Sequence, residues 1–234
     1  MAGLSDSRVR RGQSMKRHEV RARIEESGIL PSVRVSSREL ARFAGETVYA
    51  AGIPVAEITM TVPGALEVIN DLATRYPDMA VGAGTVLDEE TAQHCIEAGA
   101  RFLTSPGFVP EVVAYGNKVN VVVLPGALTP TEVIAAWKAG ADLVKIFPTG
   151  HIGGIQYIRA LKVPLPQIPL IATGGVNQTT AGDFILAGAT AIGLGGQLLP
   201  KEALHFRQVD RIHELAGRFL AMVKDARTMK DIYY

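Results

Sequence analysis

The segment AVGAGTVLDEETAQHCIEAGARFLT, residues 80–104, shows most clearly which fold this chain adopts. Its apolar run Ala80–Thr85 predicts a strand, and apolar residues recur at helical spacing over Glu89–Glu97. Asp88 is a typical N-cap, because its carboxylate can accept hydrogen bonds from backbone N–H groups of the first helical turn. A second apolar run follows at Arg101–Thr104, so the segment predicts one strand–helix–strand unit.

The same alternation continues along the chain. The predicted strands are Ile29–Val35, Val55–Met60, Ala80–Thr85, Arg101–Thr104, Val119–Leu124, Leu143–Phe147, Pro169–Thr173 and Ala191–Leu194. The predicted helices include Arg38–Ala50, Ala65–Arg75, Glu89–Glu97, Thr131–Lys138 and Gln178–Leu186, with Thr129 and Asn177 opening the last two. Glycines that permit a left-handed turn follow four helices, at Gly52, Gly99, Gly140 and Gly188. Most strands are continuously apolar, which is typical of parallel strands covered on both faces.

Eight such units in 234 residues favour a single α/β domain, a (β/α)₈ or TIM barrel, which needs roughly 250 residues. An open doubly wound sheet is the alternative, since eight strands suit both folds, but no glycine-rich phosphate fingerprint follows the first strand. We predict that residues 1–13 form a disordered basic lead and that residues 14–234 form the barrel domain. A short helix at the start of that domain is expected to cross the barrel floor.

Hydrophobic residues make up 47% of the chain and charged residues 20%, which is the balance of a protein with a sizeable core. The formal net charge is +1, so no overall field favours nucleic acid or a membrane, and we expect a small-molecule partner. Between Met1 and Glu25, seven Lys or Arg against three Asp or Glu leave a nucleic-acid contact as an alternative there. Cys95 has no second cysteine to pair with, and no stretch resembles a membrane span or secretory signal, so we expect a cytoplasmic location.

Two charged residues interrupt apolar strands whose carboxyl ends would form the active site of a barrel. Lys145 lies within Leu143–Phe147, where desolvation favours the neutral amine that attacks carbonyl groups. Glu57 lies within Val55–Met60, and an unpaired buried carboxylate is costly. We expect the two side chains to compensate each other or to perform acid/base chemistry together. The structural alternative is a lysine that pairs with a core carboxylate or extends outward.

Glycine pairs follow the last two predicted strands, at Gly174-Gly175 and Gly195-Gly196. Barrels commonly bind a substrate phosphate at this place, through backbone N–H groups and a helix N-terminus. Either pair alone is typical of a tight turn, whereas the two together favour a phosphate site. The five histidines form no spaced pairs with cysteine or carboxylates, so a metal site is not expected.

At these residues the chain resembles the 2-keto-3-deoxy-6-phosphogluconate (KDPG) / 4-hydroxy-2-oxoglutarate (KHG) aldolase family, over about residues 29–199. The stretches that carry the resemblance are Glu57-Ile58-Thr59, Val81-Gly82-Ala83-Gly84-Thr85-Val86-Leu87, Ser105-Pro106-Gly107, Leu124-Pro125-Gly126, Lys145-Ile146-Phe147-Pro148, Thr173-Gly174-Gly175-Val176 and Gly195-Gly196. Their order and spacing together are highly specific, while several of them are weak signals when taken singly.

The resemblance implies a lyase of carbohydrate metabolism that uses no metal or other cofactor and cleaves a keto acid into pyruvate and an aldehyde. It implies that Lys145 forms a Schiff base, that Glu57 is the general acid/base, and that hydroxyls bind the pyruvate carboxylate. The substrate contacts it predicts are Arg34, Thr59, Thr85, Pro106, Thr173, Gly174, Gly175, Gly195 and Gly196. The aldehyde would be glyceraldehyde 3-phosphate or glyoxylate. A homotrimer is also expected, since trimers are usual in the family.

Two positions depart from the family pattern. The best-known members carry an arginine two residues after the threonine of Glu-x-Thr, where this chain has Thr61. We hypothesise that Arg34, at the end of the first strand, supplies the missing guanidinium. Gln197 stands where phosphate-specific members often have serine, which makes an unphosphorylated acid such as 4-hydroxy-2-oxoglutarate more plausible.

Two other functions remain compatible with the residues. One is a phosphate-binding barrel that acts as an isomerase or synthase, in which Lys145 is an electrostatic contact and not a nucleophile. The other is a catalytically silent barrel that binds a keto acid but has lost the carboxylate clamp at Thr61. Imine formation and turnover distinguish both from an aldolase.

Overall fold

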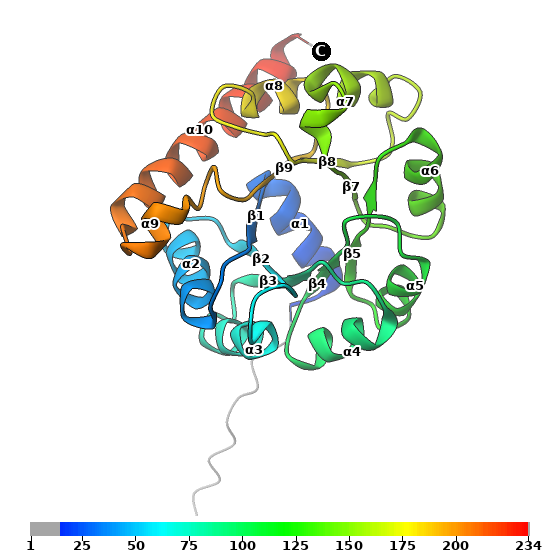
Figure 1. Ribbon diagram of the computed structural model, residues 1–234. Helices are drawn as coiled ribbons and strands as arrows, with labels where there is room; N and C mark the ends of the chain where they lie inside the picture. Colours follow the sequence, from blue (N-terminus) through cyan, green and yellow to red (C-terminus); the bar gives the residue numbers. More distant parts are fainter. Residues whose placement is uncertain (1–14, 234) are drawn as a thin grey trace, which may run out of the picture.

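The computed structural model describes the backbone of residues 15–233 and the side chains of residues 15–230. The predicted disordered lead, residues 1–13, lies outside the described residues. Parallel strands form a closed barrel surrounded by helices (Figure 1). The strands are β1 (Ile29–Val33), β2 (Val55–Thr59), β3 (Ala80–Gly84), β4 (Phe102–Thr104), β5 (Val122–Leu124), β6 (Gly126–Ala127), β7 (Val144–Ile146), β8 (Leu170–Thr173) and β9 (Ala191–Leu194).

The barrel closes at Pro125, which divides one barrel strand into β5 and β6. The strand order is β5-β4-β3-β2-β1-β9-β8-β7-β6, so the two ends of the sheet are the two halves of one segment. Proline has no backbone N–H to donate, yet its carbonyl accepts from Lys145 N at 2.9 Å, and Val123 O accepts from Asp142 N at 3.0 Å. The predicted (β/α)₈ barrel is therefore confirmed, and the open doubly wound sheet is excluded.

The helix α1 (Arg17–Ser27) lies across one end of the barrel, and the other helices surround the strands (Figure 1). These are α2 (Arg38–Ala50), α3 (Ala65–Arg75), α4 (Glu89–Glu97), α5 (Pro110–Lys118), α6 (Pro130–Lys138), η1 (Thr149–His151), α7 (Gly154–Lys162), α8 (Ala181–Leu186), α9 (Lys201–His205) and α10 (Val209–Tyr233). The long helix α10 packs against α8 and α2 and closes the ring (Figure 1). No helix in residues 15–233 is long and apolar enough to cross a membrane.

Two predicted boundaries are wrong by three residues, for local reasons, and several strand ends differ by one or two. The strand predicted over Val119–Leu124 starts only at Val122, because Val119 is the C-cap of α5 and Asn120 adopts a left-handed φ of 58°. The helix predicted from Gln178 starts at Ala181. Asn177 does not cap it, because its side-chain oxygen accepts from Thr179 N at 2.9 Å within the preceding turn.

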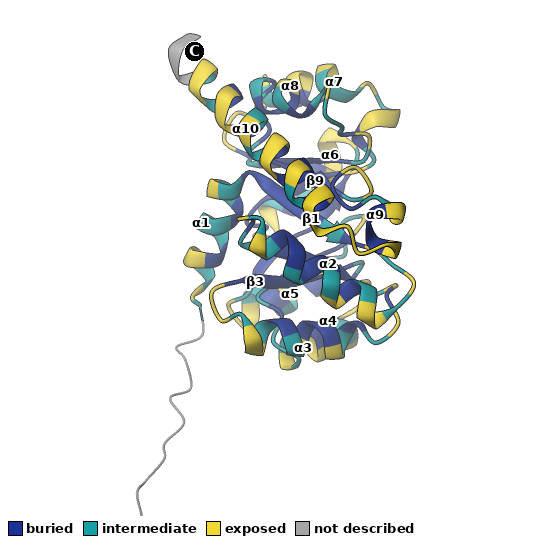
Figure 2. Ribbon diagram, turned by 90° about the vertical axis from the view of Figure 1, so that its left-hand side faces the viewer, coloured by how far each residue is buried: buried dark blue, intermediate teal, exposed yellow. Residues whose placement is uncertain are grey.

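Apolar side chains fill the lower part of the barrel, and α1 seals it there. Val20 and Ile24 of α1 pack with inward-facing strand residues such as Leu30 and Phe102. Gly82 makes room for Phe102, since a Cβ at Gly82 would lie 2.3 Å from the ring. The strands are buried, and exposed residues lie on the outer faces of the helices (Figure 2). The interior is therefore closed at the amino ends of the strands.

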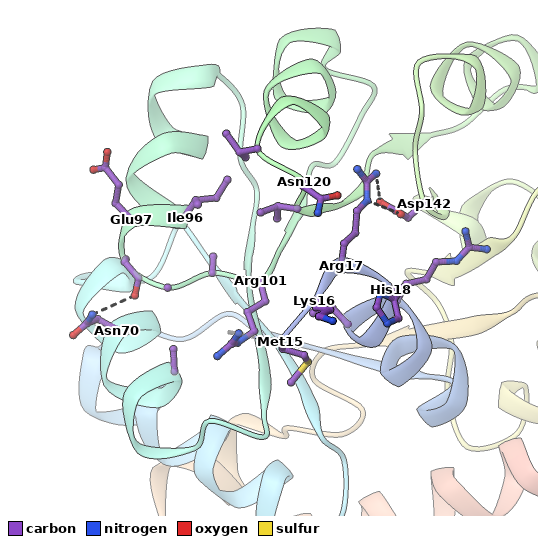
Figure 3. Close-up of a pocket in the computed structure, with 18 of the residues that line it drawn as sticks. Met15, Lys16, Arg17, His18, Asn70, Ile96, Glu97, Arg101, Asn120 and Asp142 are labelled. Carbon is purple, nitrogen blue, oxygen red and sulfur yellow. Dashed lines mark hydrogen bonds and ion pairs between the residues drawn. The ribbon is translucent and has the colours of Figure 1, made fainter. Parts of the chain in front are cut away.

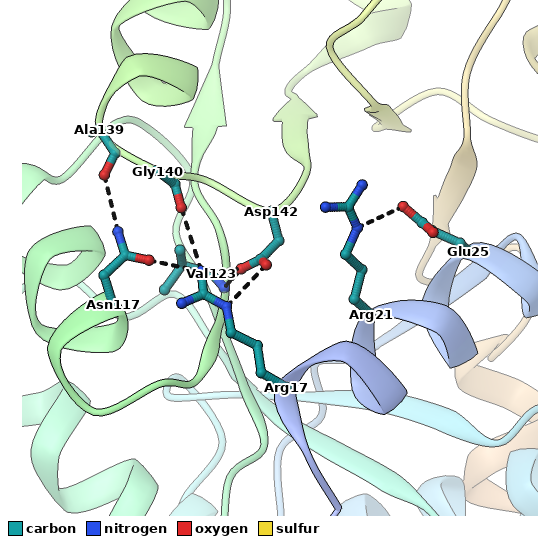
Figure 4. A network of polar contacts seen from close by, with 8 residues as sticks. All are labelled: Arg17, Arg21, Glu25, Asn117, Val123, Ala139, Gly140 and Asp142. Atoms are coloured by element: carbon teal, nitrogen blue, oxygen red, sulfur yellow. Dashed lines mark hydrogen bonds and ion pairs between the residues drawn. The ribbon is translucent and has the colours of Figure 1, made fainter.

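An ion pair fastens α1 to the barrel floor (Figure 4). Arg17 donates from Nε to Asp142 Oδ1 at 3.0 Å and from a terminal nitrogen to Asp142 Oδ2 at 2.7 Å. The same nitrogen donates to Asn117 Oδ1 at 2.7 Å, and Asp142 Oδ2 also accepts from Val123 N at 2.8 Å. Arg17 thus joins the first helix to the α5 end and to the loop before β7.

We expect Arg17→Met to lower the free energy of unfolding by about 2–3 kcal/mol, because it leaves a nearly buried carboxylate without its cation. The matched control is Arg21→Met, which removes an exposed i,i+4 pair with Glu25 and should cost less than about 1 kcal/mol. Urea unfolding of the two variants measures the difference. Equal losses would show that the contact with Asp142 does not fasten the helix.

Candidate active site

A cavity of about 870 Å³ lies at the amino ends of the strands, between α1 and the loops that precede β4, β5 and β7 (Figure 3). Polar and charged side chains line it, among them Lys16, Arg17 and Arg101. Burial and the positive charge of Arg23 lower the pKa of Arg101. None of the predicted site residues lines this cavity. Barrels carry out catalysis at the opposite, carboxyl ends of the strands.

A cavity of about 540 Å³ lies at those carboxyl ends. Every predicted site residue except Thr59 lines it: Arg34, Glu57, Thr85, Pro106, Lys145, Thr173, Gly174, Gly175, Gly195 and Gly196. These residues come from seven different strand–loop junctions of the barrel, and only closure of the barrel brings them together. We call this space the upper cavity.

Lys145 and Glu57 form a buried pair within the upper cavity. Lys145 Nζ lies 3.4 Å from Glu57 Oε2, and the residues are 7% and 1% exposed. Both side chains are on the barrel interior and not among the outer helices. The pair fulfils the expectation that the two charges compensate each other, and it places a carboxylate beside the amine.

Gly84 creates the space that the Glu57 carboxylate occupies. A Cβ added at Gly84 would lie 2.2 Å from Glu57 Oε1 and 2.6 Å from Cδ. Since Thr59 and Gly84 are register partners in neighbouring strands, β3 lies directly beside the strand that carries Glu57. A glycine at position 84 therefore fixes where the carboxylate can lie.

We expect Gly84→Ala to lower kcat/KM at least about 10-fold, because displacing a catalytic group by about 1 Å costs up to about 10²-fold. Gly217→Ala in α10 is the control, since a Cβ there meets nothing within 4 Å. That control should keep full activity and gain about 0.5–1 kcal/mol of stability. A Gly84→Ala enzyme with unchanged kcat/KM would mean that the position of Glu57 is not critical.

Arg34 lies on one side of the upper cavity and bridges two threonines. One terminal nitrogen donates to Thr61 Oγ1 at 3.0 Å, and the other donates to Thr85 Oγ1 at 3.1 Å. Thr85 has a left-handed φ of 60°, which is uncommon for a residue other than glycine and is often found at functional sites. The guanidinium thus contacts the residue that stands where the best-known family members have arginine.

Thr59 does not line the upper cavity, so its role as a substrate contact stays a prediction. Its side chain is fully buried and donates to Val33 O at 3.0 Å. Its oxygen also lies 2.9 Å from Thr61 Oγ1. Alternation puts Thr59 on the same strand face as Glu57, but its hydroxyl bonds to the neighbouring strand β1 and is covered there. The Thr59 hydroxyl thus holds the Thr61 hydroxyl in place, and the Thr61 hydroxyl accepts a hydrogen bond from Arg34.

Thr173 and the glycine pairs lie at the ends of β8 and β9, and β9 is the neighbour of β1. Thr173 Oγ1 is buried and has no hydrogen-bond partner among the described residues, so a ligand group could satisfy it. Gly193 leaves space for it, since a Cβ there would lie 2.2 Å from Thr173 Oγ1. Gly175 has a φ of 88° and allows close packing against Gly150, whereas Gly196 faces open space.

Four further residues line the upper cavity without having been predicted as contacts: Ser32, Phe147, Val176 and Gly193. Strand alternation could have predicted two of them, Phe147 and Ser32. Side chains alternate along a strand, so residues two positions from Lys145 and from Arg34 share their faces. Gln197, noted above as a departure from the family, also lines the cavity. Among the residues that the structure describes, no three His, Cys, Asp or Glu side chains gather as a metal site.

The model of one protein family, described as KDPG and KHG aldolase, matches residues 20–215. The chain belongs to this aldolase family. A 2-dehydro-3-deoxy-phosphogluconate aldolase of Pseudoalteromonas atlantica is 34% identical over 74% of this chain and 80% of its own length. The KHG/KDPG aldolase of Escherichia coli is 31% identical over 80% of this chain and 88% of its own. Membership of the family makes this protein a lyase that breaks a carbon–carbon bond.

Solved structures agree with this membership. A KDPG aldolase from Legionella pneumophila, with pyruvate captured as a covalent carbinolamine intermediate, has a TM-score of 0.78 and 30% identity. The match covers 84% of this aldolase and 96% of that chain. A 3-hexulose-6-phosphate synthase has a TM-score of 0.68 at 19% identity, and it shares the fold alone.

Proposed function

We propose that this aldolase forms a Schiff base between Lys145 and the keto carbon of its substrate, and that it releases pyruvate and an aldehyde. The observation that carries the proposal is the Lys145–Glu57 pair, 3.4 Å apart at the inner end of the upper cavity. An amine beside a carboxylate in a water-poor space can exchange protons with it while attacking a carbonyl. The covalent carbinolamine of the Legionella aldolase supports the same chemistry here.

The residues can carry each step of the reaction. Lys145 Nζ attacks C2 of the keto acid, and loss of water from the carbinolamine gives a protonated imine. Glu57, directly or through a water, takes the proton of the C4 hydroxyl, while the C3–C4 bond electrons move into the C2–C3 bond. C4 becomes the carbonyl carbon of the aldehyde, which leaves, and an enamine remains on Lys145. Protonation of C3 and hydrolysis of the imine release pyruvate and restore the free amine.

The pyruvate carboxylate has donors on two sides of the upper cavity. The Thr85 hydroxyl lies beside Arg34, and the Thr173 hydroxyl has no partner of its own among the described residues. We propose that both hydroxyls bind the carboxylate and that Arg34 supplies the positive charge. In this role Arg34 takes the place of the arginine that the best-known family members carry at the position of Thr61.

We expect Arg34→Ala to raise the KM of any pyruvate-bearing substrate about 10–100-fold, because charge-assisted hydrogen bonds contribute about 1.5–3 kcal/mol. Arg38→Ala is the matched control, since Arg38 is exposed at the start of α2 and does not line the upper cavity. Steady-state kinetics with pyruvate release as the readout measures both variants. An unchanged KM in Arg34→Ala would rule out the clamp.

Two experiments test the function as a whole. A screen of 2-keto-3-deoxy acids and 4-hydroxy-2-oxoglutarate for pyruvate release would exclude a silent barrel if any acid turns over. Borohydride reduction in the presence of pyruvate should add mass permanently at Lys145, and a barrel that acts as an isomerase or synthase would show no such adduct. A homotrimer in the cytoplasm, without nucleic-acid or membrane partners, remains part of the proposal.

A further inference from the structure

Thr149 is a fully buried polar residue to which the proposed reaction assigns no part. It follows Lys145 by four positions, begins η1, and is 0% exposed. Burying a hydroxyl costs free energy unless hydrogen bonds are made to it. The partners of the Thr149 hydroxyl therefore indicate what it does.

The Thr149 hydroxyl joins the ends of two neighbouring strands. Its Oγ1 donates to the carbonyl oxygen of Ile146, the last residue of β7, at 2.7 Å. The same atom lies 3.0 Å from Thr173 O and accepts from Thr173 N at 3.1 Å. Both backbone polar groups of Thr173, the last residue of β8, thus face one hydroxyl, and that hydroxyl is bound to the residue after Lys145.

The strand register shows why Thr173 needs a contact on this side. β7 and β8 pair in register up to Ile146 and Ala172, whereas β8 and β9 pair as far as Thr173 and Gly193. Thr173 therefore has a register partner in β9 and none in β7. The Thr149 side chain contacts its backbone where β7 has ended.

The backbone that follows Thr149 reinforces this contact. Gly150 N donates to Gly174 O at 2.7 Å, and a Cβ added at Gly150 would lie 2.8 Å from Gly175 Cα. The chain segments after β7 and β8 thus run against each other without space for a side chain at Gly150. A displacement of the first segment therefore displaces the second.

The side chain of Thr173 is the part of this arrangement that reaches the substrate. Thr173 lines the upper cavity, and its buried Oγ1 has no hydrogen-bond partner among the described residues. That oxygen lies beside Gly193, where an added Cβ would be 2.2 Å away. Lys145 is on the neighbouring strand, in register with Ile171. The position of the Thr173 hydroxyl relative to the amine therefore depends on how the end of β8 is joined to β7.

We propose that Thr149 is a positioning residue for keto-acid binding. Its hydroxyl fixes the backbone of Thr173 against β7, so that the Thr173 hydroxyl meets the carboxylate of a keto acid bound to Lys145. Thr149 does not line the upper cavity, and it acts through Thr173. This inference rests on the proposed function, which places the imine on Lys145 and the carboxylate at Thr173.

The pyruvate concentration that gives half-maximal borohydride trapping at Lys145 tests the inference. It measures keto-acid binding without an aldehyde, and it does not depend on the amount of folded enzyme. Thr149→Val replaces the hydroxyl by a methyl group and should raise this concentration at least about tenfold, because a charge-assisted hydrogen bond to the carboxylate is lost. Thr149→Ser keeps the hydroxyl and should restore the concentration to within about threefold of its original value. Thr47→Val in α2 is the matched control, because it removes a buried hydroxyl that donates to Phe43 O at 2.7 Å, and it should leave the concentration unchanged.

A double-mutant cycle distinguishes a positioning role from a general loosening of the fold. Thr173→Val removes the hydroxyl that meets the carboxylate and should raise the half-maximal concentration about as much as Thr149→Val. In Thr173→Val, the further change Thr149→Val should add less than about twofold, because residues that act through one contact are not additive. Losses that multiply, or an unchanged concentration in Thr149→Val, overturn the inference. Thr149→Ala takes the place of the valine variant in the cycle if that variant does not fold.

The same measurement separates this inference from the proposed function. Without an adduct at Lys145 in the unmodified enzyme, the proposed function fails and this inference fails with it. With an adduct but without an effect of Thr173→Val, only the contact to the carboxylate and this inference fail. With both present, the cycle alone decides whether Thr149 positions Thr173.

Discussion

Lys145→Met should reduce pyruvate release by at least about 10³-fold, which is the largest effect expected of any single substitution in this protein. Methionine keeps most of the volume of the side chain but has no amine, so no imine can form and the C3–C4 bond has no electron sink. Glu57 and the substrate contacts remain in place, and binding alone gives little acceleration. Pyruvate release coupled to a dehydrogenase measures the loss.

Lys138→Met is the matched control, because Lys138 is exposed at the end of α6 and lies outside the upper cavity. It should retain full activity and should still acquire the borohydride adduct with pyruvate. Peptide mapping should find that adduct on the β7 peptide of the control and nowhere in Lys145→Met. An adduct on another lysine, or substantial activity in Lys145→Met, would refute the assignment of the nucleophile.

Glu57→Gln should lower kcat about 10²–10⁴-fold, which is the usual contribution of a general acid/base. Glutamine has nearly the same shape, so it fits the space beside Gly84, but it cannot accept the proton of the C4 hydroxyl. It also removes the carboxylate that lies 3.4 Å from Lys145 Nζ. KM should change less than kcat, because Glu57 acts mainly on protons that move during the reaction.

Glu67→Gln in α3 serves as the control, since Glu67 is exposed and does not line the upper cavity. Single-turnover trapping with borohydride measures the rate of imine formation. A merely structural role of Glu57 would leave this rate unchanged in folded enzyme. Slow adduct formation in Glu57→Gln indicates a proton shuttle during imine formation, while the thermal unfolding midpoint reports on the fold. If kcat fell only in proportion to a loss of folded protein, Glu57 would be a structural partner of the lysine.

The amino-acid pattern predicted all the strands of the barrel and several of its helices. Helices predicted over Arg38–Ala50, Ala65–Arg75 and Glu89–Glu97 agree with the structure at both ends. Their boundaries depend on local chemistry, such as the Asp88 carboxylate that accepts from Thr91 N at 2.7 Å. The pattern failed near Asn120 and Asn177, where a left-handed residue and a side-chain turn occur that periodicity does not report.

The candidate site depended more on the tertiary structure. Sequence reasoning found Lys145 and Glu57 because a charge inside an apolar strand is costly and so has a purpose. It assigned Thr59 to the substrate, although the side chain bonds to Val33 O. It also did not predict Phe147 and Ser32, which line the cavity. Strand alternation places them on the right faces, but neither side chain has a charge or a reactive group that would single it out.

The sequence by itself determined the repeated strand–helix units and the two charged residues within apolar strands, because propensity, capping and desolvation act over a few neighbouring residues. Only the tertiary structure decided that residues 88 positions apart lie 3.4 Å from each other, and that residues of seven strands and their following loops line one cavity. Closure of the barrel sets these distances. It depends on the register of all the strands together, which no single segment of the chain encodes.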